Sequence, residues 1–425
     1  MKDKDLEIFS LQSLDSKSLA DLRIIAEKEK IPDYQELNKR DLILSILKVL
    51  DKNDTGISIE GILEIINDGI HGILRSYTLL PGENDVYVSG SQIKKFNLKQ
   101  GDYIKGKARL PKDNERYLSI LKIEKINERD PNEAAKRTPF ERLTPIFPAE
   151  QIKLEIDQFR LSNRIIDLLS PIGKGQRGMI VSPPKSGKTT LLKDIADGIS
   201  ENHKEIHLMI LLIGERPEEV TDIRKSTKAE VFASNFDEQP ENQIKVAEIV
   251  LDRSKRLVEE GKDVVILVDS LTRLARAYNI TVPPSGRTLS GGFDPIALYP
   301  PKKFFGSARN LEEYGSLTII ATALVDTGSR MDDLVYEEFK GTGNMELHLD
   351  RKLSERRIYP AIDVVKSGTR HEEKLLSPEV LNQSWIIRRM LDTLKSGESS
   401  ELLIERLKKT KNNNEFLLTL HENLN

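Results

Sequence analysis

Ser182-Pro-Pro-Lys-Ser-Gly-Lys188-Thr189 follows the apolar run at 179–181 and precedes an amphipathic stretch at 191–196. A strand, a glycine-bearing loop and a helix form the context in which phosphate-binding loops occur. Backbone N–H groups of such a loop, together with the positive end of the helix, attract a triphosphate. The segment therefore predicts a nucleotide site, although Ser182 stands where the G-x-x-x-x-G-K-[ST] pattern begins with glycine.

Two residues of this loop are expected to carry chemistry. We expect Lys188 to reach the β and γ phosphates and the Thr189 hydroxyl to bind Mg²⁺. The aliphatic run Asp263-Val-Val-Ile-Leu-Val-Asp269 ends in a carboxylate, as expected of a central strand that completes a Mg²⁺ site. Taken alone, Asp269 could be a solvated acid at the end of a buried strand. Beside Lys188, it predicts a site for ATP and Mg²⁺.

A second apolar run, His207-Leu-Met-Ile-Leu-Leu-Ile213, is followed by Gly214-Glu215-Arg216. A carboxylate at this strand end could polarise an attacking water, because hydrolysis needs a base within hydrogen-bond reach. Glu215 could equally be a structural acid in a salt bridge. From the residues alone, both interpretations stay open.

Composition limits the classes of protein. A length of 425 residues favours about two or three domains. A net charge of −3 gives no global attraction for nucleic acid, so any RNA site must be a local patch. The absence of cysteine excludes disulfides and thiolate chemistry and fits a reducing compartment. The first residues lack an apolar signal core and aliphatic runs are strand-sized, which predicts a cytoplasmic protein without membrane spans.

The sequence pattern changes along the chain and predicts four segments. Residues 1–50 carry helical periodicity, and residues 51–128 carry short β-branched and aromatic runs separated by turn residues. Five such strands suggest a small closed barrel of the OB type, a fold that commonly binds oligonucleotides. A polar stretch at 129–157 is interpreted as a linker. Residues 158–425 alternate strands and helices, which predicts an α/β fold with a doubly wound parallel sheet.

Two later loops combine glycine, hydroxyl groups and one arginine. They are Pro283-Pro-Ser-Gly-Arg287-Thr288-Leu-Ser290-Gly-Gly292 and Thr327-Gly-Ser-Arg330-Met-Asp332. Backbone amides, hydroxyls and a single cation suit contacts to phosphate and sugar better than base reading. As isolated segments, both could be ordinary surface turns. Spacing alone assigns no role to Arg357 or Arg370.

Four motifs together resemble one family. They are Pro183-Pro-Lys-Ser-Gly-Lys-Thr189, Gly214-Glu-Arg-Pro-Glu-Glu-Val220, Asp269-Ser-Leu-Thr-Arg-Leu-Ala-Arg-Ala-Tyr-Asn279 and Tyr336-Glu-Glu-Phe-Lys-Gly-Thr-Gly-Asn-Met-Glu346. The chain resembles bacterial transcription termination factor Rho over most of its length, including Asn97-Leu-Lys-Gln-Gly-Asp102. The resemblance implies a homohexamer of RecA-like P-loop ATPase domains, each with an OB-type, cold-shock-like RNA-binding domain. Such a ring translocates 5′ to 3′ on nascent single-stranded RNA and ends transcription by the RNA polymerase elongation complex.

The resemblance also implies roles for individual residues. Glu215 becomes the catalytic carboxylate, Arg370 an arginine finger supplied to a neighbouring subunit, and Arg357 a second nucleotide-sensing arginine. Tyr359 stands where the family stacks an aromatic ring on adenine. The implied nucleotide contacts are Lys185, Ser186, Gly187, Lys188, Thr189, Thr190, Arg216 and Tyr359.

RNA contacts are implied in two places. The implied pore-loop residues are Arg287, Thr288, Ser290 and Arg330, and both arginines stand where well-studied relatives carry lysine. In the barrel, Tyr87, Arg116 and Tyr117 match RNA-contact positions, although both tyrosines could simply be barrel surface residues. The neighbouring segment Asp68-Gly-Ile70-His71-Gly72-Ile73-Leu-Arg75 is one residue longer than the family pattern and lacks Phe and Tyr. Because stacking provides much of single-strand affinity, we expect a weakened or altered site here.

Two other functions compete with this interpretation. A rotary-type ATPase subunit would share Gly214-Glu215-Arg216 but would not bind RNA through its N-terminal barrel. An RNA-binding module with a decayed ATPase is the second alternative, and the filled catalytic positions argue against it. Stimulation of ATP hydrolysis by RNA separates the first alternative from a Rho-type enzyme.

Overall fold

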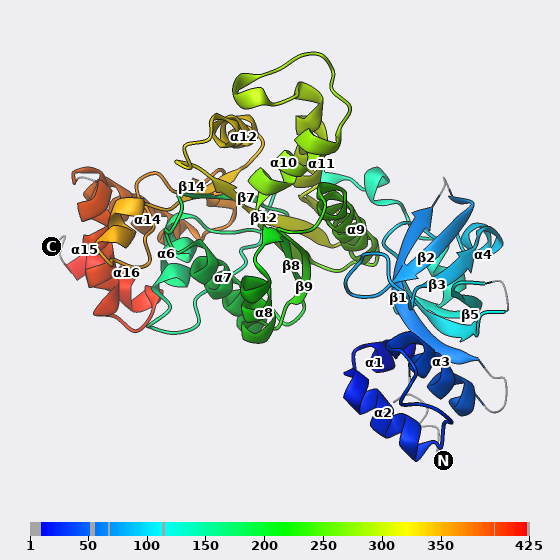
Figure 1. The fold of residues 1–425 in the computed structure, drawn as a ribbon. Coiled ribbons are helices and arrows are strands. Elements are labelled where there is room, and N and C mark those ends of the chain that lie inside the picture. Colours follow the sequence, from blue (N-terminus) through cyan, green and yellow to red (C-terminus); the bar gives the residue numbers. More distant parts are fainter. Residues whose placement is uncertain (1–9, 52–55, 67–68, 113–114, 395, 423–425) are drawn as a thin grey trace. The chain divides into compact units, whose positions relative to one another are not determined.

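The computed structural model describes residues 10–51, 56–66, 69–112, 115–394 and 396–422. The chain divides into two compact units, one formed by residues 1–139 with 249–256 and one by 140–248 with 257–425 (Figure 1). Within the described ranges, no helix combines the length and apolar character that crossing a membrane requires.

The first unit begins with three short helices, α1 (Leu11–Asp15), α2 (Leu19–Lys28) and α3 (Lys39–Leu50). Each is capped by a side chain that accepts a backbone N–H from the first turn, as Asn38 does for α3. Buried aliphatic residues of these helices, such as Leu22 and Ile46, belong to the same apolar cluster as the barrel that follows. The helices therefore pack on the barrel and share its core.

The barrel is closed and has five strands. They are β1 (Ile57–Ile66), β2 (His71–Arg75), β3 (Val86–Ser89), β4 (Tyr103–Arg109) and β5 (Leu118–Ile126), in the spatial order β1-β2-β3-β5-β4. Helix α4 (Gly90–Lys95) follows β3, and α5 (Pro131–Ala134) follows β5. Burial alternates along β4 because successive side chains point into and out of the barrel. The prediction of a small OB-type barrel is confirmed.

The second unit is built on a twisted, mostly parallel sheet in the order β14-β13-β7-β12-β10-β8-β9. The parallel strands are β7 (Arg177–Ser182), β8 (His207–Glu215), β9 (Glu230–Asn235), β10 (Val264–Asp269), β12 (Ser316–Leu324) and β13 (Met345–His348). Antiparallel pieces are β14 (Gly368–Thr369), β11 (Arg309–Leu311) and β6 (Pro145–Ile146). Strand β10 is buried throughout, as expected of a sheet covered on both faces. The predicted α/β parallel sheet is confirmed.

Helices cover both faces of this sheet (Figure 1). One face packs against α6 (Leu161–Leu169), α7 (Lys188–Asn202), α8 (Pro217–Ser226), α14 (Pro378–Asp392), α15 (Ser396–Lys408) and α16 (Asn413–Glu422). The other helices are α9 (Pro240–Glu259), α10 (Leu271–Thr281), α11 (Tyr299–Gly306), α12 (Arg330–Lys340) and α13 (Arg351–Glu355). Helices α10 and α12 contact β12 but contribute no described residue to the apolar cluster of the first face, so they lie on the opposite face.

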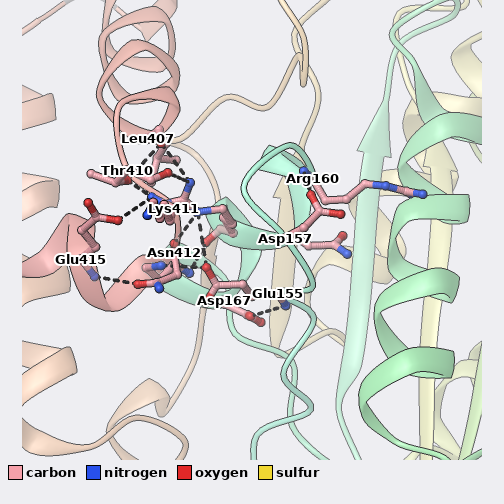
Figure 2. Close-up of polar contacts among 12 residues, drawn as sticks. Glu155, Asp157, Arg160, Asp167, Leu407, Thr410, Lys411, Asn412 and Glu415 are labelled. Carbon is pink, nitrogen blue, oxygen red and sulfur yellow. Dashed lines mark hydrogen bonds and ion pairs between the residues drawn. The ribbon is translucent and has the colours of Figure 1, made fainter.

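Helix α6 is anchored by two buried charged residues. Arg164 donates to the carbonyl oxygens of Leu407 and Thr410, at the end of α15. Asp167 accepts the backbone N–H of Glu155, and Figure 2 shows these two residues side by side. These contacts tie α6 to the segment before it and to the C-terminal helices. They thereby hold α6 in place beside α7.

Candidate active site and nucleic-acid interface

The phosphate-binding loop lies between β7 and α7, as its sequence predicts. Gly187 has φ 90° and Lys185 has φ 63°, so the chain turns through left-handed conformations that favour glycine at the first of these positions. The Ser186 hydroxyl donates to the Pro183 carbonyl at 2.8 Å and lies 2.9 Å from the Ser182 hydroxyl. The serine that replaces the first motif glycine is therefore buried and braces the loop from within.

Strand ends bring three predicted residues together. Lys188 Nζ lies 2.6 Å from Asp269 Oδ1 and 3.1 Å from Glu215 Oε1. Because β8 and β10 are neighbouring parallel strands, their carboxyl ends deliver both acids to one edge of the sheet. The Thr322 hydroxyl on β12 donates to Asp269 at 2.8 Å. The arrangement brings the predicted phosphate lysine to both predicted acids.

The surroundings shift the pKa of two of these groups. Burial raises the pKa of Glu215, and the charge of Asp269 adds to the rise, while Lys188 and Arg273 oppose it. Arg273 Nη2 lies 3.4 Å from Glu215 Oε1. Burial alone would lower the pKa of Lys188, but Asp269 and Glu215 outweigh burial and the pKa is raised. Lys188 therefore keeps its positive charge, and Glu215 accepts a proton more readily than an ordinary glutamate.

Oxygen donors at this edge match the chemistry of Mg²⁺. Thr189 is the second residue of α7, and Asp269 ends β10, so a hydroxyl and a carboxylate come from adjoining elements. Mg²⁺ prefers a few protein oxygens and completes its shell with phosphate and water. In the described part of the chain, no group of three or more His, Cys, Asp or Glu side chains is placed to hold a metal by itself.

A cavity of about 340 Å³ adjoins the loop. Its described lining comprises Phe159, Leu161, Ser162, Ser186, Gly187, Thr190, Leu191, Asp194, Leu349, Tyr359, Pro360 and Ala361. A Cβ atom at Gly187 would lie 3.6 Å from Tyr359 Cε1, so the tyrosine ring lies against the loop. This ring is 46% exposed and offers a face for stacking. We call this space the base cavity.

The predicted arginines lie in different places. Arg357 precedes Tyr359 by two residues and has φ 61°. Arg216 is exposed at the start of α8, where its carbonyl accepts backbone N–H groups of the first turn. Arg370 is exposed and lines a separate cavity of about 370 Å³, whose described lining includes no residue of the phosphate-binding loop. Within one chain, the structure therefore does not bring Arg370 to Lys188.

The two arginine-bearing loops predicted to grip RNA adjoin each other. Arg287, Thr288 and Ser290 are exposed in the segment between α10 and α11. Arg330 is the exposed first residue of α12. A Cβ atom at Gly291 would lie 2.6 Å from the backbone nitrogen of Met331, so the first loop packs directly on the start of α12. The two arginine-bearing segments form one surface.

One connection was missed by the sequence reasoning. Arg276 on α10 forms a two-pronged ion pair with buried Asp332 on α12, with Nε–Oδ1 2.8 Å and Nη2–Oδ2 2.5 Å. The Thr327 hydroxyl donates to the same carboxylate at 2.6 Å. Because α10 begins directly after the strand that ends in Asp269, this pair joins the edge of the sheet that carries Asp269 to the loop of Arg330. Arg276 and Asp332 are 56 residues apart in the chain. In the sequence, Arg276 lies in the motif at 269–279 and Asp332 in the loop at 327–332, but no pattern links the two residues.

The barrel brings together the three predicted RNA-contact residues. Tyr87, Arg116 and Tyr117 line one cavity of about 500 Å³, and the Arg116 guanidinium lies 5.2 Å from the centre of the Tyr117 ring. The His71 ring stacks on Tyr87, with centres 5.6 Å apart and an angle of 25°. An aromatic ring therefore does stand beside this cavity, although Phe and Tyr are missing from the segment. Ile73 is buried at 6% exposure, which favours a packing role for that position.

Ile70 and Lys105 are not among the described residues that line this cavity. Ile70 is 71% exposed, and Asp68 lies outside the described residues. Lys105 pairs with Glu128 at 2.8 Å and with Glu60 at 3.8 Å, so its charge is balanced within the barrel. The ammonium group of Lys105 is therefore engaged by carboxylates of the barrel.

These features define a P-loop ATPase that carries an N-terminal oligonucleotide-binding barrel. Three family models match in consistent places: the Rho termination factor N-terminal domain at residues 13–55, the Rho termination factor RNA-binding domain at 59–132, and the nucleotide-binding domain of the ATP synthase alpha/beta family at 162–369. The chain belongs to the family of transcription termination factor Rho. The rotary alternative is not favoured, because the barrel matches an RNA-binding domain.

Relatives cover nearly the whole chain. Transcription termination factor Rho of Bacillus subtilis (strain 168) is 54% identical over 419 residues, which span 99% of this chain and 97% of the relative. Rho of Aquifex aeolicus (strain VF5) is 53% identical over 423 residues, which span 98% and 97%. A solved type III secretion ATPase of pathogenic bacteria matches with TM-score 0.52 at 24% identity, over 61% of this chain and 82% of that one. This last likeness concerns the fold alone.

Proposed function

We propose that this chain is an RNA-dependent ATPase and helicase that moves 5′ to 3′ along nascent RNA. It acts in the cytoplasm as a homohexamer, uses ATP with Mg²⁺, and ends transcription by displacing the RNA polymerase elongation complex. The observation that carries the proposal is the Lys188–Glu215–Asp269 cluster in a chain that also has a Rho-type RNA-binding barrel. We divide the chain into a helical subdomain (1–50), an RNA-binding domain (51–128), a linker (129–157) and an ATPase domain (158–425).

The ion pairs of Lys188 indicate how nucleotide binding readies the site. Lys188 is held by Asp269 and Glu215, and a triphosphate in the loop competes with both carboxylates for the ammonium group. When Lys188 turns to the phosphates, Glu215 can accept a proton from water and Asp269 can act as a metal ligand. Thr189 and Asp269 would hold Mg²⁺, which would supply neutralising charge beside the phosphates.

Placement of Arg370 supports hydrolysis at subunit interfaces. Its side chain is exposed and lies away from the loop of its own chain. An arginine supplied in trans can stabilise the charge that develops on the transferred phosphoryl group and can raise the rate by about 10³–10⁵-fold. Arg370 is therefore assigned to the nucleotide of a neighbouring subunit, and Arg357 to sensing the nucleotide near Tyr359.

RNA engagement is assigned to two surfaces. Tyr87, Arg116 and Tyr117 of the barrel offer rings and a cation to single-stranded RNA. The joined loops of Arg287 and Arg330 offer cations, hydroxyls and backbone amides, which suit the sugar-phosphate backbone. The ion pair of Arg276 with Asp332 connects the second surface to α10, which follows the strand that ends in Asp269.

Hydrolysis assays on the full chain test this function. ATP turnover is measured with and without pyrimidine-rich single-stranded RNA, and a Lys188→Ala variant serves as the inactive reference. We expect strong stimulation by RNA in the wild type and no turnover in the variant. ATP turnover that does not respond to RNA would refute RNA-dependent translocation and would favour the rotary-type alternative.

A further inference from the structure

The base cavity contains one carboxylate that neither the motifs nor the resemblance assigned. Of the described residues that line the cavity, Asp194 alone carries a charge, and most of the others are apolar. Its side chain is 16% exposed, so water competes only weakly for its oxygens. A largely buried carboxylate on a mostly apolar wall needs hydrogen-bond partners, and a ligand in the cavity can provide one.

Two neighbours hold this carboxylate in a fixed orientation. Arg160 Nη1 donates to Asp194 Oδ1 at 2.7 Å, and the Ser162 hydroxyl donates to Oδ2. Arg160 also pairs with Asp197 at 2.8 Å, which holds the guanidinium in place. Each carboxylate oxygen has two lone pairs, so Asp194 keeps capacity to accept a further donor.

Helix geometry places Asp194 where a base would lie. Thr190 and Asp194 are four residues apart on α7 and share the face that lines the cavity. Asp194 lies about 10 Å along the helix axis from Gly187, at about 1.5 Å per residue. The same cavity is lined by Gly187, Tyr359 and Asp194, so it offers space for the base of a nucleotide whose phosphates lie on the loop.

Two of the hydroxyl groups of the wall are already engaged, and none of its hydroxyl groups carries a charge. The Ser162 hydroxyl is turned toward Asp194, and the Ser186 hydroxyl donates to the Pro183 carbonyl inside the loop. A base that presents a donor along its edge therefore finds its charged acceptor in Asp194. Adenine presents such a donor in its exocyclic amino group, whereas guanine presents a carbonyl oxygen at the same ring position.

We propose that Asp194 accepts a hydrogen bond from the exocyclic amino group of adenine and thereby selects ATP over GTP. A carboxylate that faces the guanine carbonyl leaves two acceptors opposed, which disfavours the wrong base. Arg160 and Ser162 act as positioning residues for this carboxylate. The inference rests on the proposed function only in taking the base cavity as the nucleotide site.

A substrate that lacks the amino group isolates this contact. The test compares ATP with purine riboside triphosphate, which carries hydrogen in place of the amino group, in the wild type and in Asp194→Ala. We expect kcat/KM of the wild type to fall about 10-fold or more for the analogue, since a hydrogen bond to a charged group has been removed. The Asp194→Ala variant should use both substrates equally, and its preference for ATP over GTP should fall by a similar factor.

A matched control and a second variant complete the design. Asp197→Ala removes the other partner of Arg160 but does not alter the lining of the cavity, so it should keep wild-type discrimination. Asp194→Asn preserves the shape of the side chain, and its amide can donate to guanine, so the GTP/ATP ratio should rise. This variant gives the result even if Asp194→Ala is too unstable to assay.

Equilibrium binding separates the inference from the proposed function. Binding of ADP and of purine riboside diphosphate is measured by calorimetry without RNA, so the ratio of affinities does not depend on hydrolysis or translocation. The proposal is overturned if both Asp194 variants bind nucleotide with the wild-type ratio. It is also overturned if the variants instead lose discrimination between adenosine and 2′-deoxyadenosine nucleotides, because Asp194 would then contact the ribose.

Discussion

Replacement of Glu215 by glutamine tests the assignment of the catalytic carboxylate most directly. The substitution keeps the shape of a side chain that is 4% exposed and removes only its charge and its ability to accept a proton. Removal of a general base lowers turnover by about 10²–10⁴-fold. In activation free energy, that loss corresponds to about 3–5.5 kcal/mol. We therefore expect RNA-stimulated ATP hydrolysis to fall within this range.

Nucleotide binding and stability should respond differently from turnover. Lys188 keeps Asp269 at 2.6 Å but loses Glu215 at 3.1 Å as a competitor for the phosphates, so Glu215→Gln should bind ATP as tightly as the wild type or more tightly. The raised pKa of Glu215 means that the folded state disfavours the charged form of this side chain. The free energy of unfolding therefore falls as pH rises from the pKa of Glu215 in the unfolded chain to its higher pKa in the folded protein. The neutral variant should melt at the same or a higher temperature at pH 7.

Steady-state hydrolysis with saturating RNA gives the rate, fluorescence titration with a nucleotide analogue gives the affinity, and calorimetry gives the melting temperature. Asp222→Asn on α8 is a matched control, because Asp222 is an exposed carboxylate that pairs with Lys193. Turnover of Glu215→Gln within a few-fold of the wild type, with binding intact, would refute the assignment of Glu215 as the proton acceptor.

Four further outcomes are expected. The acid limb of the kcat/KM–pH profile should lie at higher pH than the pKa of an ordinary glutamate. It should move to still higher pH in Arg273→Ala, because Arg273 lowers the pKa of Glu215. An acid limb that does not move in this variant would contradict the influence of Arg273. Arg276→Ala should reduce the stimulation of ATPase by RNA while RNA-free turnover is retained, and equal losses in both would contradict a coupling role. Mixing Arg370→Ala with Lys188→Ala chains under subunit exchange should restore activity in a ratio-dependent way, whereas no gain over the separate proteins would argue against a finger in trans. His71→Ala should weaken binding of a short oligocytidine by about 1 kcal/mol, the low end of base stacking, and His71→Phe should not; equal affinities of both variants would exclude a ring contribution.

Much of the ATPase site could be predicted from the sequence because its parts are continuous in the chain. The phosphate-binding loop is one uninterrupted segment, and Glu215 and Asp269 each end an apolar run. Parallel strands of a doubly wound sheet align their carboxyl ends, so local patterns were enough to expect these residues at one edge. The barrel was likewise predictable from alternating short strands and turn residues.

Contacts between distant segments were decided only by the tertiary structure. Arg276 meets Asp332 across 56 residues, and His71 stacks on Tyr87 because β2 and β3 pair in a particular register. In the sequence, Asp194 is one of several polar residues on an amphipathic helix. Only the packing of α6 and Tyr359 around it forms a cavity in which Asp194 is the single charged residue of the described lining. Local periodicity determines which elements form, since it depends on neighbours along the chain. Which side chains then face one another depends on strand register and helix packing, and these are set by the whole core.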